Sequence, residues 1–146
     1  LQHKLKKSEI NVRREYEPEL PSVDGRGSEL NQVWTNLIDN AIDALMDKAE
    51  AEKTLWIRAY RQGDAAVVEV EDNGPGIPAE AQDRIFTAFF TTKPPGKGTG
   101  LGLPISYNIV VDKHDGDIRV ESAPGRTLFR VYLPINEECV LPPRSA

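Results

Sequence analysis

The stretch from residue 29 to residue 47 (ELNQVWTNLIDNAIDALMD) constrains the fold of this chain more than any other. Nine of its apolar side chains share one broad face at about 100° per residue, namely Leu30, Val33, Trp34, Leu37, Ile38, Ala41, Ile42, Ala44 and Leu45. A helix with so wide an apolar face must be covered by another layer of secondary structure. The stretch therefore predicts one long helix packed on the core of the domain.

Beside that face runs a narrow stripe of oxygen-bearing side chains, Asn36, Asn40, Asp43 and Asp47. A solvated helix face normally mixes Lys, Arg and Glu, whereas this stripe offers only amide and carboxylate groups. Such oxygen ligands suit a hydrated Mg²⁺, which takes one or two ligands from protein and the rest from water and phosphates. The alternative for this stretch alone is an amphipathic core helix whose Asn side chains are solvated.

A segment with two glycines, residues 71–78 (EDNGPGIP), follows the second of two predicted strands. Gly74 and Gly76 permit backbone angles or close approaches that a Cβ atom would forbid. Asp72 places a carboxylate acceptor at the strand end, where it could select the exocyclic amine of an adenine. The alternative is a plain turn, because Asn-Gly and Pro-Gly pairs are common in turns. A turn does not need all of these residues together, however.

A second glycine-rich segment, residues 96–103 (GKGTGLGL), leads directly into an apolar helix. Repeated glycines expose backbone N–H groups, and a helix N-terminus adds partial positive charge, so phosphates are favoured here. Lys93 and Lys97 flank the segment as candidate phosphate-binding cations. The segment is neither a P-loop nor a dinucleotide-binding fingerprint, because its residues and spacing differ from both. The alternative is a flexible linker, although linkers rarely run directly into an apolar helix.

Four segments in this order closely resemble the catalytic ATP-binding domain of sensor histidine kinases: the helix at 29–47 and residues 72–76 (DNGPG), 85–93 (IFTAFFTTK) and 98–103 (GTGLGL). That domain belongs to a superfamily shared with DNA gyrase, Hsp90 and MutL. The resemblance extends from about residue 28 to residue 134. It implies a Bergerat-type ATP-binding fold, an α/β sandwich that holds ATP between the long helix and a mobile lid.

The resemblance also implies roles for single residues. Asn40 is expected to be the Mg²⁺ ligand, Asn36 to face the phosphates and Asp72 to bind the adenine amine. Asn36 and Lys93 are the candidate catalytic residues. The remaining nucleotide-binding candidates shape the adenine wall, hinge the lid or meet the phosphates: Asp43, Gly74, Gly76, Ile77, Lys93, Lys97, Gly98, Thr99, Gly100, Leu101, Gly102, Leu103 and Thr127.

The resemblance includes a phenylalanine box, Phe86, Phe89 and Phe90, which we expect to anchor the lid rather than bind ligand. The form of residues 89–93 (FFTTK) is most similar to the nitrogen-regulation type of kinase. Two positions depart from the family pattern. Many members carry Lys or Arg where this chain has Asp43, and the usual Gly-x-Gly-Thr of the last hairpin is shortened to residues 125–127 (GRT). The lysines flanking the second glycine-rich segment are therefore expected to carry more of the phosphate charge.

No motif for a phospho-accepting histidine precedes the domain, and we expect structural roles for His3 and His114. The expected function is therefore to bind Mg·ATP and donate the γ-phosphoryl group to a histidine on a separate dimerisation domain, absent from this chain, with a response regulator downstream. One alternative is an ATPase of the gyrase, Hsp90 or MutL kind. Those enzymes use a Glu where this chain has Asn36, and an amide cannot act as a general base. The other alternative is a module that senses nucleotide without catalysis.

The remaining pattern predicts an α+β domain of two layers, with a mixed, mostly antiparallel sheet and about three helices on one face. Strands are expected at 9–16, 22–24, 54–61, 65–71, 117–122 and 127–133, and helices at 29–47, 79–86 and 101–113. Residues 1–8 are expected to be a connector, 9–134 the catalytic domain and 135–146 a C-terminal tail. The chain begins with Leu, so we expect a piece of a longer protein.

Charge and cysteine content restrict the partners and the environment. The net charge of −5, with no dominant basic patch, argues against a nucleic-acid or anionic-membrane surface. The single cysteine, Cys139, excludes a disulfide framework and is consistent with a cytoplasmic location. No apolar run has membrane-spanning length, so we expect no direct membrane contact by this domain, whether or not the parent protein is attached to a membrane.

Overall fold

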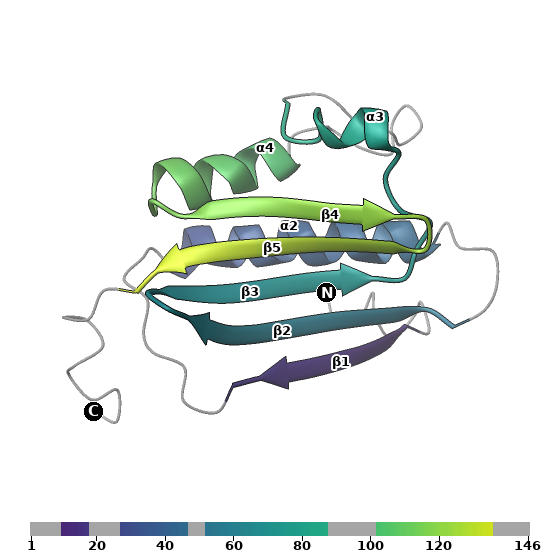
Figure 1. The fold of residues 1–146 in the computed structure, drawn as a ribbon, viewed down its shortest axis with the longest axis horizontal. Helices are drawn as coiled ribbons and strands as arrows, with labels where there is room; N and C mark the ends of the chain where they lie inside the picture. The colour runs from purple at the N-terminus through teal and green to yellow at the C-terminus, as the bar shows by residue number, and fades with distance from the viewer. Residues whose placement is uncertain (1–9, 18–26, 47–51, 88–101, 136–146) are drawn as a thin grey trace.

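A computed structural model of the chain describes residues 10–17, 27–46, 52–87 and 102–135. The strand expected at 22–24 and the segment 88–101 lie outside these residues, as do the connector and most of the tail. The described strands are β1 (Asn11–Tyr16), β2 (Thr54–Gln62), β3 (Ala65–Asp72), β4 (Asp117–Ala123) and β5 (Arg126–Pro134). They form one sheet in the order β1-β2-β3-β5-β4 (Figure 1). Only the β1–β2 pair is parallel, so the sheet is mixed and mostly antiparallel, as predicted.

Two hairpins, β2–β3 and β4–β5, supply two of the antiparallel pairs, and the β3–β5 pair joins the hairpins to each other. The β2–β3 hairpin turns at Gly63, whose φ of +59° suits a residue without a Cβ atom. The β4–β5 hairpin turns at Gly125, with φ of +89°. Alternating side chains then direct Val70 of β3 and Phe129 of β5 into the core. The alternation read from the sequence therefore placed both hairpins correctly.

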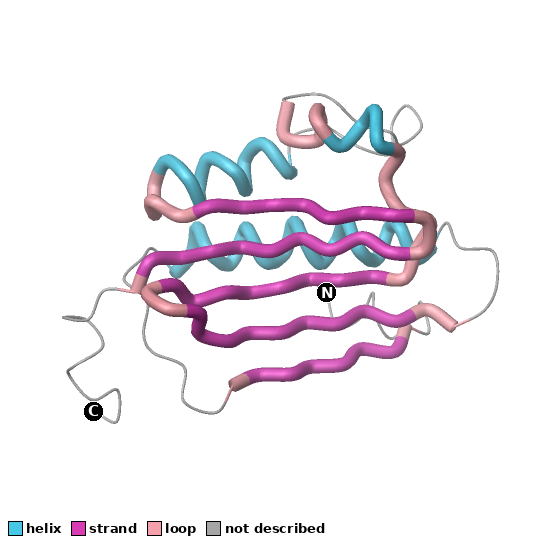
Figure 2. The backbone as a smooth tube through the Cα atoms, in the orientation of Figure 1, coloured by secondary structure: helices cyan, strands magenta, loops and turns pink. Residues whose placement is uncertain are grey.

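The helices are α2 (Gly27–Met46), α3 (Ala79–Gln82) and α4 (Gly102–Tyr107), the last continuing as a π-helical segment, η1 (Asn108–Asp112). Figure 2 shows α2 lying behind the sheet, so that the domain has two layers. The apolar face of α2 is the centre of the core, because Val33, Leu37, Ile42 and Leu45 have no exposed surface. No helix in the described part of the chain is both long enough and apolar enough to cross a membrane.

Two helices differ from the prediction. The helix expected at 79–86 ends at Gln82, and the chain then turns so that Ile85 is buried against the core. The helix expected at 101–113 changes to π-helix after Tyr107. The wider turn brings neighbouring residues closer to one face, and Ile109 and Val110 are both buried. In each case, burial of apolar side chains overrides the regular α-helix.

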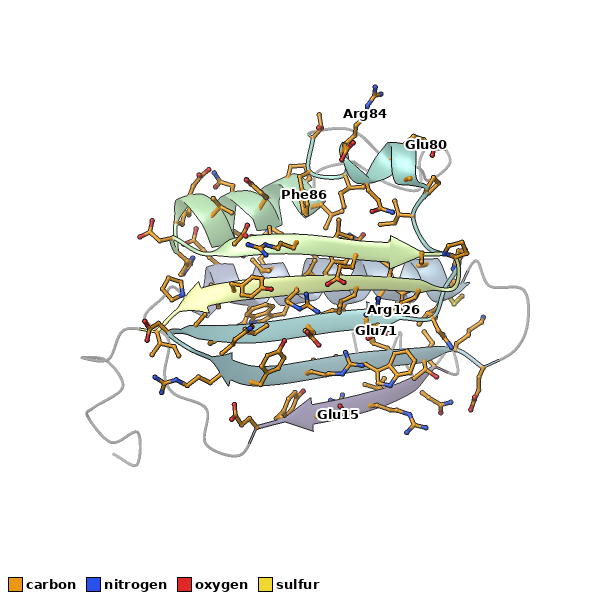
Figure 3. The ribbon with its side chains drawn as sticks, viewed as in Figure 1. Glu15, Glu71, Glu80, Arg84, Phe86 and Arg126 are labelled. Atoms are coloured by element: carbon orange, nitrogen blue, oxygen red, sulfur yellow. The ribbon has the colours of Figure 1, made fainter. Side chains whose placement is uncertain are left out.

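The sheet face opposite α2 carries an ion-pair network (Figure 3). Glu69 is its centre: Arg130 Nε lies 2.7 Å from Glu69 Oε2, and Arg58 Nη1 lies 3.1 Å from Glu69 Oε1. The Tyr60 hydroxyl donates to the same carboxylate at 2.8 Å. Arg58 also reaches Glu71 at 2.9 Å. Burial alone would raise the pKa of Glu69, but these hydrogen bonds outweigh it and hold that pKa below its usual value.

Candidate functional site

The first part of the site is the turn that follows β3. Asp72 is 3% exposed, and its Oδ1 accepts a hydrogen bond from the Gly74 N–H at 2.9 Å. Asn73 fixes the turn to the start of β2, because its Oδ1 accepts from Thr54 N–H at 2.9 Å and its Nδ2 donates to Glu52 O at 3.0 Å. The Asp72 carboxylate is therefore buried at the end of β3, and Asn73 holds the backbone that follows it against the start of β2.

The two glycines of this turn are required by close neighbours. A Cβ atom on Gly74 would lie 2.9 Å from Asp72 Oδ1 and 3.1 Å from the Ala44 carbonyl oxygen of α2. Gly76 has φ of +91°, and a Cβ there would lie 2.4 Å from the Ala123 carbonyl oxygen at the end of β4. The turn is thus pressed between the long helix and the last hairpin, and glycine is what lets it fit.

Thr127 lies beside this turn. It pairs with Asp72 across β3 and β5 and is 4% exposed. Ser122 of β4, which the sequence did not mark as a site residue, connects the turn to Thr127. Its Oγ accepts from the Ile77 N–H at 2.8 Å and lies 3.0 Å from Thr127 Oγ1. The signal available in the sequence was the hairpin register, which places Ser122 opposite Thr127.

The second part of the site is the polar flank of α2, where it meets the start of α4. Asn36 Nδ2 donates to the Gly102 carbonyl oxygen at 3.0 Å and to Ser106 Oγ at 3.1 Å. Asn40 and Asp43, further along the same flank, are half-buried. The structure therefore brings Asn36 of the oxygen-bearing stripe against Gly102, near the C-terminal end of the second glycine-rich segment. Asp47, the last member of the stripe, lies outside the described residues. Ser106 is a further residue that sequence reasoning missed, since one Ser in an apolar helix carries no signal.

The other predicted site residues divide into two groups. Ile77 and Leu103 are half-buried and pack against the hydrophobic core, next to the turn and to Gly102 respectively. The candidates that lie outside the described residues are Lys93, Lys97, Gly98, Thr99, Gly100 and Leu101. Of the phenylalanine box only Phe86 is described. Its ring centroid lies 5.3 Å from that of Tyr107 on α4 and 6.4 Å from that of Phe129 on β5.

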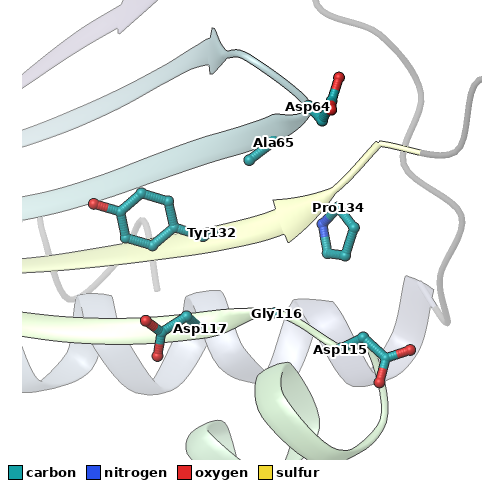
Figure 4. Close-up of a pocket in the computed structure, with 7 residues that line it drawn as sticks. All are labelled: Asp64, Ala65, Asp115, Gly116, Asp117, Tyr132 and Pro134. Atoms are coloured by element: carbon teal, nitrogen blue, oxygen red, sulfur yellow. The ribbon is translucent and has the colours of Figure 1, made fainter.

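Two other features lie apart from this site. A shallow pocket of ≈ 310 Å³ is lined by Asp64, Ala65, Asp115, Gly116, Asp117, Tyr132 and Pro134 (Figure 4). It lies at the opposite end of β3 and β5 from Asp72 and Thr127, and none of the predicted site residues lines it. His114 is buried, with Nδ1 2.8 Å from the Ile109 carbonyl oxygen, which fits a structural role. Among the described residues, no group of three or more His, Cys, Asp or Glu side chains is placed to hold a metal ion.

Comparison with known proteins gives a consistent result. Residues 25–137 match the family described as histidine kinase-, DNA gyrase B-, and HSP90-like ATPase. The sensory histidine kinase/phosphatase NtrB of Vibrio alginolyticus is 40% identical over 134 residues, which are 86% of this chain and 37% of that protein. The chain therefore spans less than two fifths of the length of such relatives.

Solved structures agree with the sequence relatives. The nucleotide-free catalytic domain of histidine kinase ThkA superimposes with a TM-score of 0.81 at 33% identity, covering 94% of this chain and 86% of that one. A second similar structure is histidine kinase ThkA in complex with the response regulator protein TrrA. Its TM-score is 0.77 at 29% identity, with 94% of this chain and 37% of that chain covered. Both structural matches therefore extend over nearly all of this chain.

Proposed function

Since the chain belongs to the histidine kinase-, DNA gyrase B-, and HSP90-like ATPase family, as the catalytic ATP-binding domain of a sensor histidine kinase, we propose that it binds Mg·ATP and donates the γ-phosphoryl group to a histidine of a partner domain. The reaction breaks the bond between the γ-phosphorus and the oxygen that leaves with ADP, and it forms a P–N bond to an imidazole. The nucleophile comes from the His-bearing dimerisation domain of the parent kinase. A response regulator then receives the phosphoryl group.

One observation carries the proposal: a single rigid helix touches both glycine-bearing segments. Asn36 of α2 contacts Gly102, and the Ala44 carbonyl of α2 faces Gly74. These two points are eight residues apart, which is about 12 Å along an α-helix. Asn40 and Asp43 lie between them on the same flank. A nucleotide laid along α2 would have adenine at the Asp72 end and phosphates at the Gly102 end, with the metal ligand between.

The adenine end offers one buried acceptor in a closed wall. Asp72 would accept a hydrogen bond from the exocyclic amine, and a buried hydrogen bond to a charged group discriminates strongly against a base that lacks the donor. Gly74 and Gly76 keep the wall thin, while Thr127 and the backbone at Ile77 are held beside it by Ser122. This end would therefore select adenine over guanine, which has a carbonyl at the corresponding position.

The metal end offers amide and carboxylate oxygens. Asn40 would be the direct Mg²⁺ ligand, and Asp43, one turn away on the helix, would accept hydrogen bonds from the metal's water ligands. This sparse oxygen set fits Mg²⁺, which keeps most of its waters and phosphate ligands. When bound, the ion neutralises charge on the phosphates. Lys93 and Lys97, with backbone N–H groups at residues 98–103, would supply the remaining positive charge.

Transfer is favoured over hydrolysis by the residue at position 36. An ATPase of this superfamily would need a general base there, and the Asn36 amide accepts no proton at neutral pH. Its nitrogen is moreover engaged by Gly102 and Ser106. The domain would therefore hold ATP until a partner histidine arrives. A module that only senses nucleotide would bind ATP equally well but would fail to phosphorylate any supplied histidine.

The first prediction tests the metal ligand by calorimetric titration of the chain with ATP, in Mg²⁺ and in excess EDTA. Asn40→Ala should weaken binding in Mg²⁺ by at least about tenfold, equivalent to 1.4 kcal/mol, and change little in EDTA. Asn31→Ala, an exposed change on the same helix, is the matched control. Transfer is then measured by adding the parent kinase's dimerisation domain with radiolabelled ATP. If Asn40→Ala binds Mg·ATP as tightly as the unmodified chain does, the assignment of Asn40 as the metal ligand is refuted. If the unmodified chain binds ATP but never labels the histidine, the module that only senses nucleotide is favoured.

A further inference from the structure

We infer that Ser106 is a positioning residue, which fixes the Asn36 amide so that Asn36 presents its oxygen, and not its nitrogen, to the nucleotide. The inference deepens the proposed function and rests on it for the nucleotide. Ser106 is completely buried on α4, one turn after Gly102. Its Oγ donates to the Gly102 carbonyl oxygen at 2.9 Å and accepts from Asn36 Nδ2 at 3.1 Å. With the 3.0 Å bond from Asn36 Nδ2 to Gly102 O, the three groups close a ring of hydrogen bonds.

The orientation of the amide follows from counting protons. An Asn side chain has two N–H protons, and here Gly102 O and Ser106 Oγ take one each. Reversing the amide would place Asn36 Oδ1 at about the same distance from the Gly102 carbonyl oxygen, so that two acceptors would face each other. The nitrogen must therefore point towards α4. What remains is Asn36 Oδ1, which has no hydrogen-bond donor among the residues that the structure describes.

The oxygen that remains limits what Asn36 can bind. Phosphate oxygens are acceptors, and so is Oδ1, so Asn36 cannot hydrogen-bond a phosphate directly. It can accept from a water ligand of the Mg²⁺ that Asn40, four residues along α2, would hold. Ser106 thus determines which kind of group Asn36 recognises, although it lies behind Asn36 and touches no ligand itself. The expectation that Asn36 faces the phosphates becomes more specific: it faces the hydration shell of their metal.

A double-mutant cycle tests whether Ser106 acts through Asn36. The affinity for ATP is measured in Mg²⁺ and in EDTA for the parent, Ser106→Ala, Asn36→Ala and the double variant. One neutral hydrogen bond is worth about 0.5–1.5 kcal/mol, so Ser106→Ala should weaken Mg·ATP about 2- to 12-fold and leave binding in EDTA unchanged. In the Asn36→Ala background it should have no further effect. Equal losses in both backgrounds would show a general packing role and would overturn the inference.

A second measurement needs no nucleotide. In ¹⁵N spectra of the chain alone, the side-chain NH₂ protons of Asn36 should exchange slowly, and Ser106→Ala should accelerate that exchange. Ser106→Cys, which leaves no cavity and has a weaker donor and acceptor, should fall between the two and covers the case in which Ser106→Ala folds poorly. Asn108→Ala, which removes an exposed amide bonded to Asp112, is the matched control and should change neither reading. Fast exchange in the parent would overturn the inference, whereas slow exchange in a parent that does not bind ATP would instead refute the proposed function.

Discussion

At the scale of single residues, glycine is required for different reasons at different positions, and Gly63 and Gly76 show the difference. Both have positive φ, at +59° and +91°. A Cβ on Gly63 would meet nothing within 4 Å, whereas one on Gly76 would lie 2.4 Å from the Ala123 carbonyl oxygen. Gly63 needs only an unusual backbone angle. Gly76 needs that angle and empty space as well.

We therefore predict that Gly63→Ala and Gly76→Ala differ in stability. The first should cost about 1–2 kcal/mol, the usual strain of a left-handed L-residue. The second should cost more, because the end of β4 must also move away from the turn. Urea unfolding of both variants at one pH gives the comparison. Equal costs would mean that the Gly76–Ala123 contact is absent in solution.

The second prediction for a single residue concerns Asp72 and the choice of base. Asp72→Asn keeps an oxygen that can accept from the Gly74 N–H. Its NH₂ group would then face the adenine amine, and ATP should bind about 10- to 150-fold more weakly, which corresponds to about 1.5–3 kcal/mol. Asp83→Asn, an exposed change after α3, is the control. The parent should also bind GTP poorly, and similar affinities of the parent for ATP and GTP would exclude an adenine pocket at Asp72.

At the scale of elements, periodic patterns predicted most of the fold. The apolar face of α2 and the alternating side chains of β2, β3, β4 and β5 are patterns among residues close together in the sequence. Such patterns can be recognised without knowing the fold. Ile85 shows where this fails. Its burial against the core ends α3 early, and that core is built from residues far away in the sequence. The change from α4 to η1 has the same cause, because Ile109 and Val110 are both buried.

The sequence was sufficient to select candidate residues of the site, but not to predict the hydrogen bonds between distant parts of the chain. Asp72, Gly74 and Gly76 stand together in the sequence, and the close backbone approaches for which the two glycines were singled out are present. The bond from Asn36 to Ser106 joins residues 70 apart in the chain. No local pattern encodes such a contact, since it depends on how α4 packs against α2. The same holds for Ser122, whose Oγ joins the Ile77 N–H of the turn to Arg126 and Thr127 of β5.

At the scale of the whole molecule, ion pairs among the described residues join the strands on the sheet face opposite α2. The network centred on Glu69 connects β2, β3, β4 and β5, because Arg130 also pairs with Glu121. Glu69 is only 6% exposed. A carboxylate so placed is costly to bury unless every partner is present. The network therefore makes the stability of the sheet depend on pH.

We predict that Glu69→Gln destabilises the domain by about 1.5–3 kcal/mol near pH 7. The pKa of Glu69 is lowered in the folded state, so its ionisation stabilises the fold above its ordinary pKa of 4.5, and that contribution is lost as the pH falls through the folded-state value. The difference in the free energy of unfolding between the unmodified chain and Glu69→Gln should accordingly become smaller in acid. Urea unfolding at pH 7 and near pH 3 measures it, with the exposed Glu80→Gln as control. A difference that is independent of pH would exclude ionisation of Glu69 as its source.

The same network has a consequence for how other molecules approach. Its positive members are Arg58, Arg126 and Arg130, and its negative members are Glu15, Glu69, Glu71 and Glu121. Three positive and four negative charges sum to −1, so −4 of the net charge of −5 belongs to the rest of the chain. A face whose charges cancel at short range produces little field beyond a Debye length. Electrostatic steering of a charged partner should therefore act mainly through the other surfaces, and encounters at this face should depend little on ionic strength.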